Sequence, residues 1–410
     1  MSISIQVAQP PLSKISTPAF GRGGNLLLLA PFIMFLCLFF VWPIGLMLSR
    51  SFYDAAPGQI MAKTKSELSI WSVTTGLPDD HVFEVFGHEL VDVLTSRDIN
   101  KVASRMGDRI PGAATLLNRS AVSLRASQAP AKQTLLSTSA LWGDPFTWDT
   151  LKASLRVLSE DKYLAAVDLA YASDGTIKVL GDGSLVNVGI YWRTIWMSCA
   201  ICFVCLILGY PAAYFLTRVK PVWAGICMTL VLIPYWTSVL VRTTGWMALL
   251  QREGLLNNIL VSLGVIDDSA RFQLIFNATG TMIVMVHVLL PVMILPLYNS
   301  MLSVPTTQVK AAVSLGAHPF RAFIDVFVPL TRSGIAAGIT LVFMLSVGYY
   351  VTPALVGGTS GTFIGNVIAF HMQQTLDWGL AAAMSALLFA LVVSIYIFQS
   401  RAINQTGKAL

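Results

Sequence analysis

Long apolar stretches run through most of the chain. Because each helical residue advances about 1.5 Å and the hydrocarbon core of a bilayer is about 30 Å thick, a spanning helix needs roughly 20 apolar residues. The segments that meet this requirement are residues 25–49, 190–217, 223–250, 279–303, 333–356 and 379–400. The pattern therefore predicts an all-α membrane bundle of six transmembrane helices. Prolines inside these segments, such as Pro211 and Pro234, are tolerated where neighbours satisfy the freed backbone groups.

One long polar stretch, residues 50–189, separates the first predicted span from the second. Phe83 to Val93 and Trp148 to Leu158 carry apolar residues at helical spacing. Thr176 to Val188 has the pattern of a β-hairpin with a turn at Gly181-Asp182-Gly183. The stretch is therefore predicted to be a large mixed α/β insert domain.

The composition agrees with burial in a membrane. Charged residues make up 12% of the chain and apolar residues 55%, whereas a soluble domain usually carries about 25% charged residues. The formal net charge of +6 is not accompanied by a nucleic-acid-binding signature, so we expect no nucleic-acid partner.

The basic residues of the short connections gather on one side of the predicted bundle. Those on the richer side are Lys14, Arg22, Arg218, Lys220, Lys310, Arg321, Arg332, Arg401 and Lys408. The short loops on the opposite side hold Arg252 and Arg271. Because cytoplasmic loops carry the excess of Lys and Arg, the tails at residues 1–24 and 401–410 are predicted to be cytoplasmic and the insert to be external. The first apolar segment is expected to be a retained span, because no signal-peptide cleavage pattern follows it.

No metal site or disulfide framework is expected. Cys199, Cys202 and Cys205 repeat every third residue inside an apolar segment, which is typical of packing in a buried helix. His81 and His88 lie two helical turns apart in an acidic stretch, which is typical of a solvated helix face.

A loop at residues 305–329 lies on the predicted cytoplasmic side, between the fourth and fifth spans. Pro305 and Thr306 favour the start of a short helix. Gly316 permits a backbone turn that a side chain would resist. The following residues, Phe320 to Phe327, have apolar positions at helical spacing, with Phe320, Phe323, Ile324 and Phe327 predicted on one face. Two short helices at a bend would form a protrusion that another protein can hold.

This loop resembles the EAA motif of binding-protein-dependent ABC importers. Ala311, Ala312, Gly316 and Pro329 match the motif at its spacing, whereas Lys310 stands where the motif has Glu. The resemblance implies that the loop seats in a groove of an ATPase subunit. The residues it assigns to coupling are Lys310, Ala311, Ala312, Gly316, Ala317, Phe320 and Pro329.

Residues 190–400 further resemble the permease core of spermidine/putrescine-type importers, as in RTIWMSCAICFVCLILGYPAAYFLTR (193–218) and YYVTPALVGG (349–358). The resemblance implies a bacterial inner-membrane location, an ABC ATPase dimer, a second permease subunit that is a copy or a paralogue, and a periplasmic solute-binding protein. The chain has no G-x-x-x-x-G-K-[ST] phosphate loop. We therefore expect no enzymatic activity in this chain, with ATP and Mg bound by the partner ATPase.

Ionisable and aromatic residues within the spans are candidates for a solute path. Arg242 can also extend along its stem to the membrane surface, and His287 can be a satisfied interior histidine. Aromatic rings attract organic cations, although tryptophans and tyrosines also form interfacial belts. Asp377, at the start of the last span, can attract an amine or cap its helix. The candidate path residues are Trp236, Arg242, Trp246, Tyr349, Tyr350 and Asp377.

The expected solute is a small nitrogenous compound. The resemblance favours a polyamine, but Arg242 in the path favours an amino-acid or opine-like compound, and both remain open. An ion- or proton-driven transporter would be expected to show acidic relays or an internal repeat. A membrane-anchored receptor would need a cytoplasmic output domain. Neither feature is visible in the sequence.

Overall fold

The computed structural model describes residues 22–158, 160–172, 176–180 and 185–408. The chain forms two compact units that divide between Ser49 and Arg50. Lys14 and most of the predicted N-terminal tail lie outside the described residues, as does the predicted turn at Gly181-Asp182-Gly183.

The first unit is an apolar helix. It consists of α1 (Arg22–Leu36), a π-helical turn η1 (Cys37–Val41) and α2 (Trp42–Ser49). The 21 residues from Leu29 to Ser49 are long and apolar enough to cross a membrane, and none of its most apolar stretch is buried inside the protein. Apolar side chains on every side of a helix suit a lipid surround. The sequence prediction of a helix at 25–49 is confirmed.

The insert domain is built almost entirely of short helices around its own core. These are α3 (Ala56–Ile60), α4 (Ala62–Ile70), η2 (Val73–Thr75), α5 (Asp80–Thr95), α6 (Ile99–Gly107), α7 (Ala113–Ala126), α8 (Ala131–Thr138), η3 (Ala140–Gly143), α9 (Pro145–Ser154) and α10 (Asp161–Ala166). The core centres on Trp142 and Trp148, both fully buried. Trp142 Nε1 donates to Ser120 Oγ over 2.8 Å and Trp148 Nε1 donates to the Trp142 carbonyl over 3.0 Å, so each indole N–H keeps a partner.

The structure corrects two predictions for the insert. The strand predicted at Ile177–Val179 (β2) exists, but it pairs antiparallel with Leu169–Tyr171 (β1) and not with the residues that follow it. Val186 starts a long helix instead, because the apolar pattern of the next span extends back to it. Among the described residues of the insert, the strands form one two-stranded sheet, and the other elements are helices. The predicted helix at Trp148–Leu158 is α9, which ends at Ser154.

The remaining elements form the membrane core. In chain order they are α11 (Val186–Arg218), α12 (Pro221–Leu232), η4 (Ile233–Trp236), α13 (Val239–Leu250), α14 (Leu255–Ser262), η5 (Asp268–Ala270), α15 (Ala278–Leu302), α16 (Thr306–Ser314), α17 (Pro319–Ala322), η6 (Phe323–Phe327), α18 (Val328–Leu330), α19 (Arg332–Gly348), α20 (Val351–Val356), α21 (Ile364–Gln373) and α22 (Trp378–Lys408).

Helices α11, α15 and α19 pack against one another at the centre of this core. Small residues allow the close approach of α15 and α19: a Cβ added at Gly334 would lie 2.4 Å from Cβ of Ser300. Gly338 repeats the arrangement one turn later against Met293, giving the small-xxx-small spacing that is common between membrane helices. Cys202 and Cys205 are buried in the same core cluster, whereas Cys199 is exposed.

Among the described residues, four helices are long and apolar enough to cross a membrane, and six if each of two bent pairs counts as one span. The predicted span 223–250 is bent by 98° between Pro221–Trp236 and Val239–Ser262. Helix α12 ends at Leu232, and Pro234, which lacks an N–H, lies in the short turn Ile233–Trp236 that closes the first half. The predicted span 333–356 is also interrupted, because α19 ends at Gly348.

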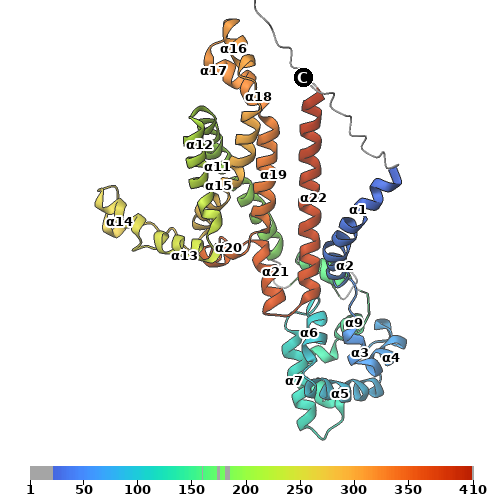
Figure 1. Ribbon diagram of the computed structural model, residues 1–410. Coiled ribbons are helices and arrows are strands. Elements are labelled where there is room, and N and C mark those ends of the chain that lie inside the picture. The colour runs from blue at the N-terminus through green and yellow to red at the C-terminus, as the bar shows by residue number, and fades with distance from the viewer. Residues whose placement is uncertain (1–21, 159, 173–175, 181–184, 409–410) are drawn as a thin grey trace, which may run out of the picture. The chain divides into compact units, whose positions relative to one another are not determined.

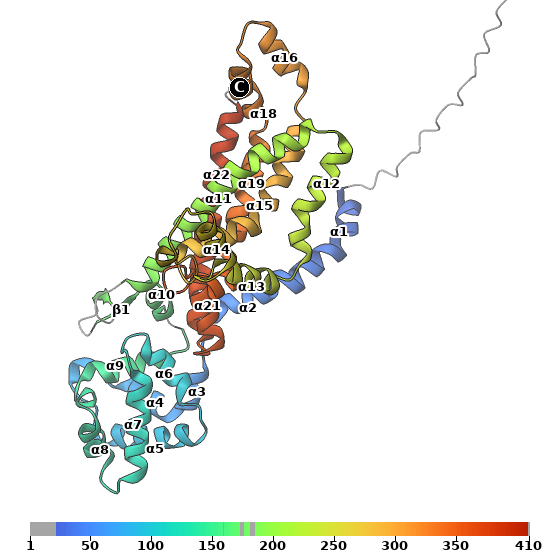
Figure 2. The ribbon, with the colours of Figure 1, turned by 90° about the vertical axis from the view of Figure 1, so that its left-hand side faces the viewer.

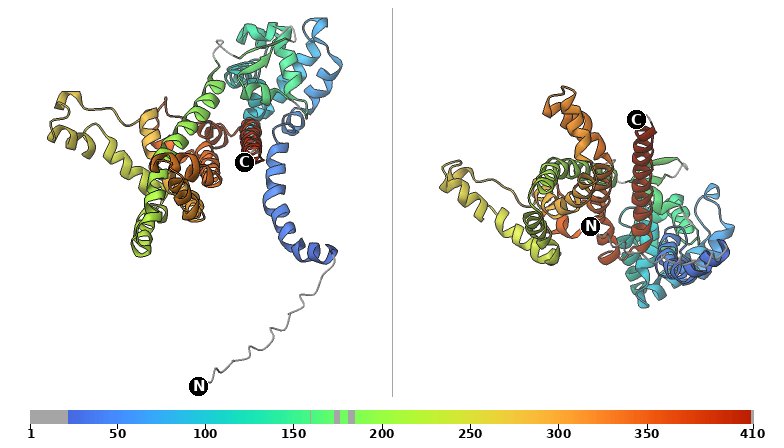
Figure 3. Two further views of the ribbon diagram at one scale, coloured as in Figure 1. Left: turned by 90° about the horizontal axis from the view of Figure 1, so that it is seen from above. Right: turned by 45° about the horizontal axis from the view of Figure 1, so that its top comes forward.

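Within the second unit, the loop α16–α18 and the insert lie at opposite ends of the bundle (Figures 1 and 2). Helices α13 and α14 extend sideways from the bundle (Figure 3). The arrangement agrees with the sequence prediction that the loop and the insert face opposite sides of the membrane.

Candidate functional site

The loop predicted to act in coupling forms two helices at a bend. Helix α16 ends at Ser314, and two residues later Gly316 has a left-handed backbone with φ of 95°. The Gly316 N–H donates to the Val313 carbonyl over 3.0 Å, and the Ala317 N–H donates to the Ala312 carbonyl over 3.1 Å. This pair of bonds is the Schellman arrangement that satisfies the last carbonyls of a helix. The turn that the sequence predicted at Gly316 is therefore present.

Helix α17 follows this bend at once. His318 Nδ1 accepts the Phe320 N–H over 3.3 Å, so the first turn of α17 has its own cap. Directly after α17, the five residues Phe323–Phe327 form a π-helical turn. Such a turn widens the spacing of side chains around the helix. The predicted single apolar face is consequently split: Phe323 and Phe327 point inward, whereas Phe320 and Ile324 are exposed.

The inward half ties the loop to α11. Phe323 and Phe327 stack with ring centroids 5.4 Å apart. The ring of Tyr214, on α11, meets them edge-on at 5.1 and 5.3 Å. Tyr210, one turn earlier on α11, shares a 2.9 Å hydrogen bond with Thr331 at the end of the loop. The loop therefore contacts α11, a central helix of the bundle, through packed rings and a hydrogen bond.

The outward-facing part of the loop carries exposed apolar side chains and an exposed lysine. Leu315 is 89% exposed and Phe320 is 66% exposed, and Lys310 and Ala311 are exposed on α16. Ala312, Ala317 and Pro329 are half-buried. Beside Pro329 lies a cleft of about 400 Å³, and its lining residues include Gln308, Asp325 and Arg332. Exposed leucine and phenylalanine side chains are typical of a surface that another protein covers.

The bend in the third predicted span is held by Arg242. Its guanidinium, from α13, donates to the carbonyl of Pro234 and, over 3.0 Å, to the carbonyl of Thr237. It also lies 5.7 Å from the centre of the Tyr235 ring. Arg242 therefore satisfies backbone groups that the break leaves without helical partners.

A second break lies where α19 ends. Tyr349 and Tyr350 connect α19 to α20 in non-helical conformations, and the amide of Asn366 donates to the Tyr350 carbonyl over 2.7 Å. The two breaks meet, because α13 packs against α20 and the hydroxyls of Thr243 and Thr352 lie 3.2 Å apart in a buried contact. Transporters use interrupted helices of this kind for solute contacts.

The structure brings some of the predicted path residues together and leaves others apart. Trp246 Nε1 donates to His287 Nδ1 over 3.1 Å, so His287 is a satisfied histidine. Trp246 and Tyr349 pack against one apolar cluster. Tyr350 is 44% exposed and Trp236 is 90% exposed, so neither is enclosed within the chain.

Asp377 belongs to a different set of contacts. Its Oδ1 accepts the Leu380 N–H over 2.9 Å, so it caps the start of α22 as one of the two sequence alternatives predicted. Its Oδ2 lies 2.7 Å from Nζ of Lys162, in the insert. Sequence reasoning missed Lys162, Thr243, Thr352 and Asn366. A polar residue inside an apolar segment was the available signal for Thr243 and Thr352.

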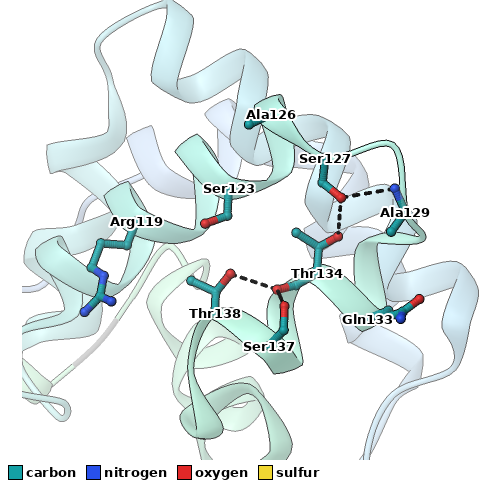
Figure 4. Close-up of a pocket in the computed structure, with 9 residues that line it drawn as sticks. All are labelled: Arg119, Ser123, Ala126, Ser127, Ala129, Gln133, Thr134, Ser137 and Thr138. Carbon is teal, nitrogen blue, oxygen red and sulfur yellow. Dashed lines mark hydrogen bonds between the residues drawn. The ribbon is translucent and has the colours of Figure 1, made fainter.

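The insert carries a shallow cleft of about 570 Å³ between α7 and α8 (Figure 4). Small hydroxyl residues line it, and several of them bond within the domain. Thr134 Oγ1 donates to Ser127 Oγ over 3.0 Å. Ser137 and Thr138 both donate to the Thr134 carbonyl over 2.8 Å. The Thr134–Ser127 contact joins α8 to the end of α7, and the other two bonds lie within α8.

Comparison with known proteins assigns the membrane core. Residues 206–405 match the model of the family described as binding-protein-dependent transport system inner membrane component. The spermidine/putrescine transport system permease protein PotB of Haemophilus influenzae is 32% identical over 219 residues, which cover 53% of this chain and 76% of PotB. The chain belongs to this permease family.

Other permeases are similar over the same share of the chain. PotB of Escherichia coli is 36% identical over 204 residues, covering 49% of this chain and 74% of the relative. The inner membrane ABC transporter permease protein YdcU of Escherichia coli is 29% identical, covering 52% of this chain and 72% of the relative. A crystal structure of a bacterial alginate ABC transporter aligns with a TM-score of 0.45 at 14% identity, covering 53% of this chain and 77% of that chain, a likeness too weak to bear on function.

Membership makes this chain a multi-pass transport subunit of an ABC importer. The family model begins at residue 206, so it includes the coupling loop and both helix breaks. The insert lies before the matched residues.

Proposed function

We propose that this permease translocates a small nitrogenous solute, with a polyamine such as spermidine or putrescine as the first candidate, across a bacterial inner membrane. The names of the PotB relatives support the polyamine. Rings in and beside the two breaks, among them Tyr235, Trp246 and Tyr349, support a cationic solute, because aromatic faces attract organic cations by about 0.5–2 kcal/mol. Arg242 favours the second candidate, a zwitterionic amino-acid or opine-like compound, through charge complementarity.

The path runs past the two helix breaks, with Arg242, Trp246, Tyr349 and Tyr350 beside it and Trp236 at its edge. Asp377 lies outside it in this proposal, because its carboxylate is engaged by Lys162 and by the first turn of α22. The alternatives of an ion-driven transporter or a receptor are not favoured.

The loop at 305–329 docks on an ATPase subunit that binds ATP and Mg²⁺. The observation that carries this proposal is the loop's two-sided construction, with an exposed tip at Leu315 and Phe320 and an aromatic anchor from Phe323 to Tyr214 on α11. Lys310, in place of an acid, favours an acidic residue on the ATPase. A second permease subunit completes the path, a periplasmic binding protein delivers the solute, and both termini are cytoplasmic.

Uptake into proteoliposomes that contain the assembled transporter tests this function. Leu315→Asp puts a charge on the exposed tip, and solute uptake and solute-stimulated ATP hydrolysis are expected to fall at least tenfold while insertion is unchanged. Leu263→Asp is the matched control, since Leu263 is 70% exposed on the α13–α14 arm, and it should retain uptake. Normal coupling in Leu315→Asp would refute the docking role. Competition between labelled putrescine and unlabelled amino acids separates the two solute classes.

A further inference from the structure

Three charged residues from distant parts of the chain meet where the insert contacts the membrane core. Lys162 lies on α10, Asp108 follows α6, and Asp377 caps α22. Lys162 Nζ lies 3.1 Å from Asp108 Oδ1 and 2.7 Å from Asp377 Oδ2, and the Lys162 side chain is 4% exposed. Ser104 Oγ accepts from Lys162 Nζ over 3.1 Å and itself donates to Asp377 Oδ2. We call Lys162, Asp108 and Asp377 the ion triad.

Other charged groups surround the ion triad on each side. Arg105, on α6, and His371, on α21, both interact electrostatically with triad members. Arg109 donates to Asp161 Oδ1 through Nε over 3.2 Å and through its terminal nitrogen over 2.9 Å. This second pair joins the end of α6 to the start of α10, so Lys162 is presented from a fixed position in the insert.

An apolar contact accompanies the ion triad. Ala166 on α10 is buried together with Ala383 and Met384 on α22, and Tyr163 and Leu380 pack against them. A Cβ added at Gly379 would lie 3.3 Å from Cε of Lys162, so the first turn of α22 approaches the lysine stem closely. The insert and α22 are therefore joined by both charge and packing.

The energetic balance makes each member dependent on the others. Burial alone would lower the pKa of Lys162, but Asp108 and Asp377 outweigh burial and raise it, so Lys162 remains an ammonium. Burial acts to raise the pKa of Asp377, but Lys162 and Ser104 hold it below its ordinary value. Removing one partner of a buried pair leaves an uncompensated buried charge. The stability lost in this way is several times larger than the net stability that the intact pair contributes.

We propose that Lys162 is a positioning residue for transport, which locks the insert to the outer end of α22 so that the insert and the α21–α22 pair move as one body in the transport cycle. The inference rests on the proposed function of the core and extends it to the insert, which lies outside the family match. α21 is included because it packs against α22, and Val367 and Ile368 of α21 pack against the Ala166 cluster.

A double-mutant cycle on the whole transporter tests the lock. Lys162→Met removes the ammonium and keeps the stem, and Asp377→Asn removes one charge while keeping a residue that caps helices well. Each is expected to lower the maximal uptake rate at least fivefold with little change in KM. Hydrogen exchange at the Leu380 amide is expected to rise at least tenfold, while the amides of α5 and α7 stay protected.

The double variant shows whether Lys162 and Asp377 act through the same contact. If the two residues act through one contact, Lys162→Met/Asp377→Asn loses no more uptake than the worse single variant, and Lys162→Arg recovers part of the loss. Losses that multiply in the double variant, or wild-type uptake in Lys162→Met, would overturn the proposal. Lys132→Met is the matched control, because Lys132 pairs with Asp80 in an exposed bridge of 2.6 Å on the same domain, and it should keep full uptake.

Failure of the lock is distinguishable from failure of the proposed function. A wild-type transporter with no ATP-dependent uptake refutes the function itself. Normal wild-type uptake together with an unaffected Lys162→Met protein refutes only the lock. If Lys162→Met does not assemble, Asp377→Asn alone carries the test through its uptake rate and the Leu380 exchange rate.

Discussion

Nζ of Lys162 lies 2.7 Å from Oδ2 of Asp377, although the two residues are 215 positions apart in the chain. The contact joins the end of the insert to the first turn of the last span. Because a buried ion pair requires accurate geometry to offset the loss of hydration, the relative position of these two elements is narrowly defined. The insert is thereby fixed to the transport helices and is not a tethered appendage.

Asp108 gives this junction a pH dependence. Burial, which outweighs the attraction of Lys162, raises the pKa of Asp108 from 3.8 to about 7, and its Oδ2 has no hydrogen-bond partner among the described residues. The folded protein therefore keeps a proton that the unfolded chain releases. Its contribution to the free energy of unfolding is fully present below the unfolded pKa and is lost as pH rises through the folded pKa.

We expect the melting temperature of the purified transporter to fall between about pH 4 and pH 7, the interval between the unfolded and folded pKa of Asp108, and Asp108→Asn to reduce this slope. Thermal unfolding in detergent across this range measures it. Asp98→Asn is the control, because Asp98 pairs with Lys101 on an exposed surface and should leave the slope unchanged. Equal slopes in wild type and Asp108→Asn would contradict the assignment.

Gly316→Ala is expected to uncouple the coupling loop. The φ of 95° at Gly316 costs an L-residue about 1–2 kcal/mol, which corresponds to roughly a five- to thirty-fold loss of the docking-competent loop. Solute-stimulated ATP hydrolysis and uptake should fall together by about this factor. Gly225→Ala is the control, because nothing lies within 4 Å of its Cβ position; a loss as large in this variant would argue against a specific effect of the left-handed turn.

Arg242→Met is expected to destabilise the bend between α12 and α13. The change leaves the Pro234 and Thr237 carbonyls without their charged donor, at a cost of about 1–3 kcal/mol. Uptake and melting temperature should both fall. Arg252→Met, at an exposed position on the same arm, should change neither, and a stable Arg242→Met protein with normal uptake would remove Arg242 from both the bend and the path.

Gly334→Leu is expected to separate α15 from α19. The new Cβ would lie 2.4 Å from Cβ of Ser300 and 2.7 Å from the Pro296 carbonyl oxygen, and overpacking of this kind costs about 1–3 kcal/mol. The melting temperature in detergent measures the loss. Gly225→Leu adds the same side chain where nothing lies within 4 Å of the Cβ position. This variant should leave the melting temperature nearly unchanged. A neutral Gly334→Leu would show that the two helices do not need this close contact.

The sequence predicted those features that depend on local chemistry. Gly316 predicted the turn of the coupling loop because only glycine enters the left-handed region without strain. The apolar spacing of Phe83 to Val93 predicted α5 because helical periodicity reflects a buried face. The resemblance of the loop to a known motif predicted the family to which the chain belongs.

Features that depend on distant contacts were not predictable in the same way. The mean hydropathy of residues 223–250 carries no information about the 98° bend within them. Pro234 and the polar pair Thr237-Ser238 are the sequence features that lie at the bend. The partner of β2 was predicted on the wrong side, because an isolated short strand specifies no register. Lys162 has the sequence context of a solvated surface lysine, and it is buried by contacts with Asp108 and Ser104 of the insert and with Asp377 before α22.

The unbroken course of α22 has a mechanical consequence. From Trp378 to Arg401 the helix has 24 residues, which is roughly 36 Å of continuous rod at 1.5 Å per residue. Asp377 fastens its outer end to the insert, and near its other end Gln399 Nε2 donates to the Ala336 carbonyl of α19 over 3.3 Å. A rigid helix held to the insert at one end and to α19 near the other converts a tilt at its first end into a displacement at its last, so the positions of the insert and α19 are linked through α22.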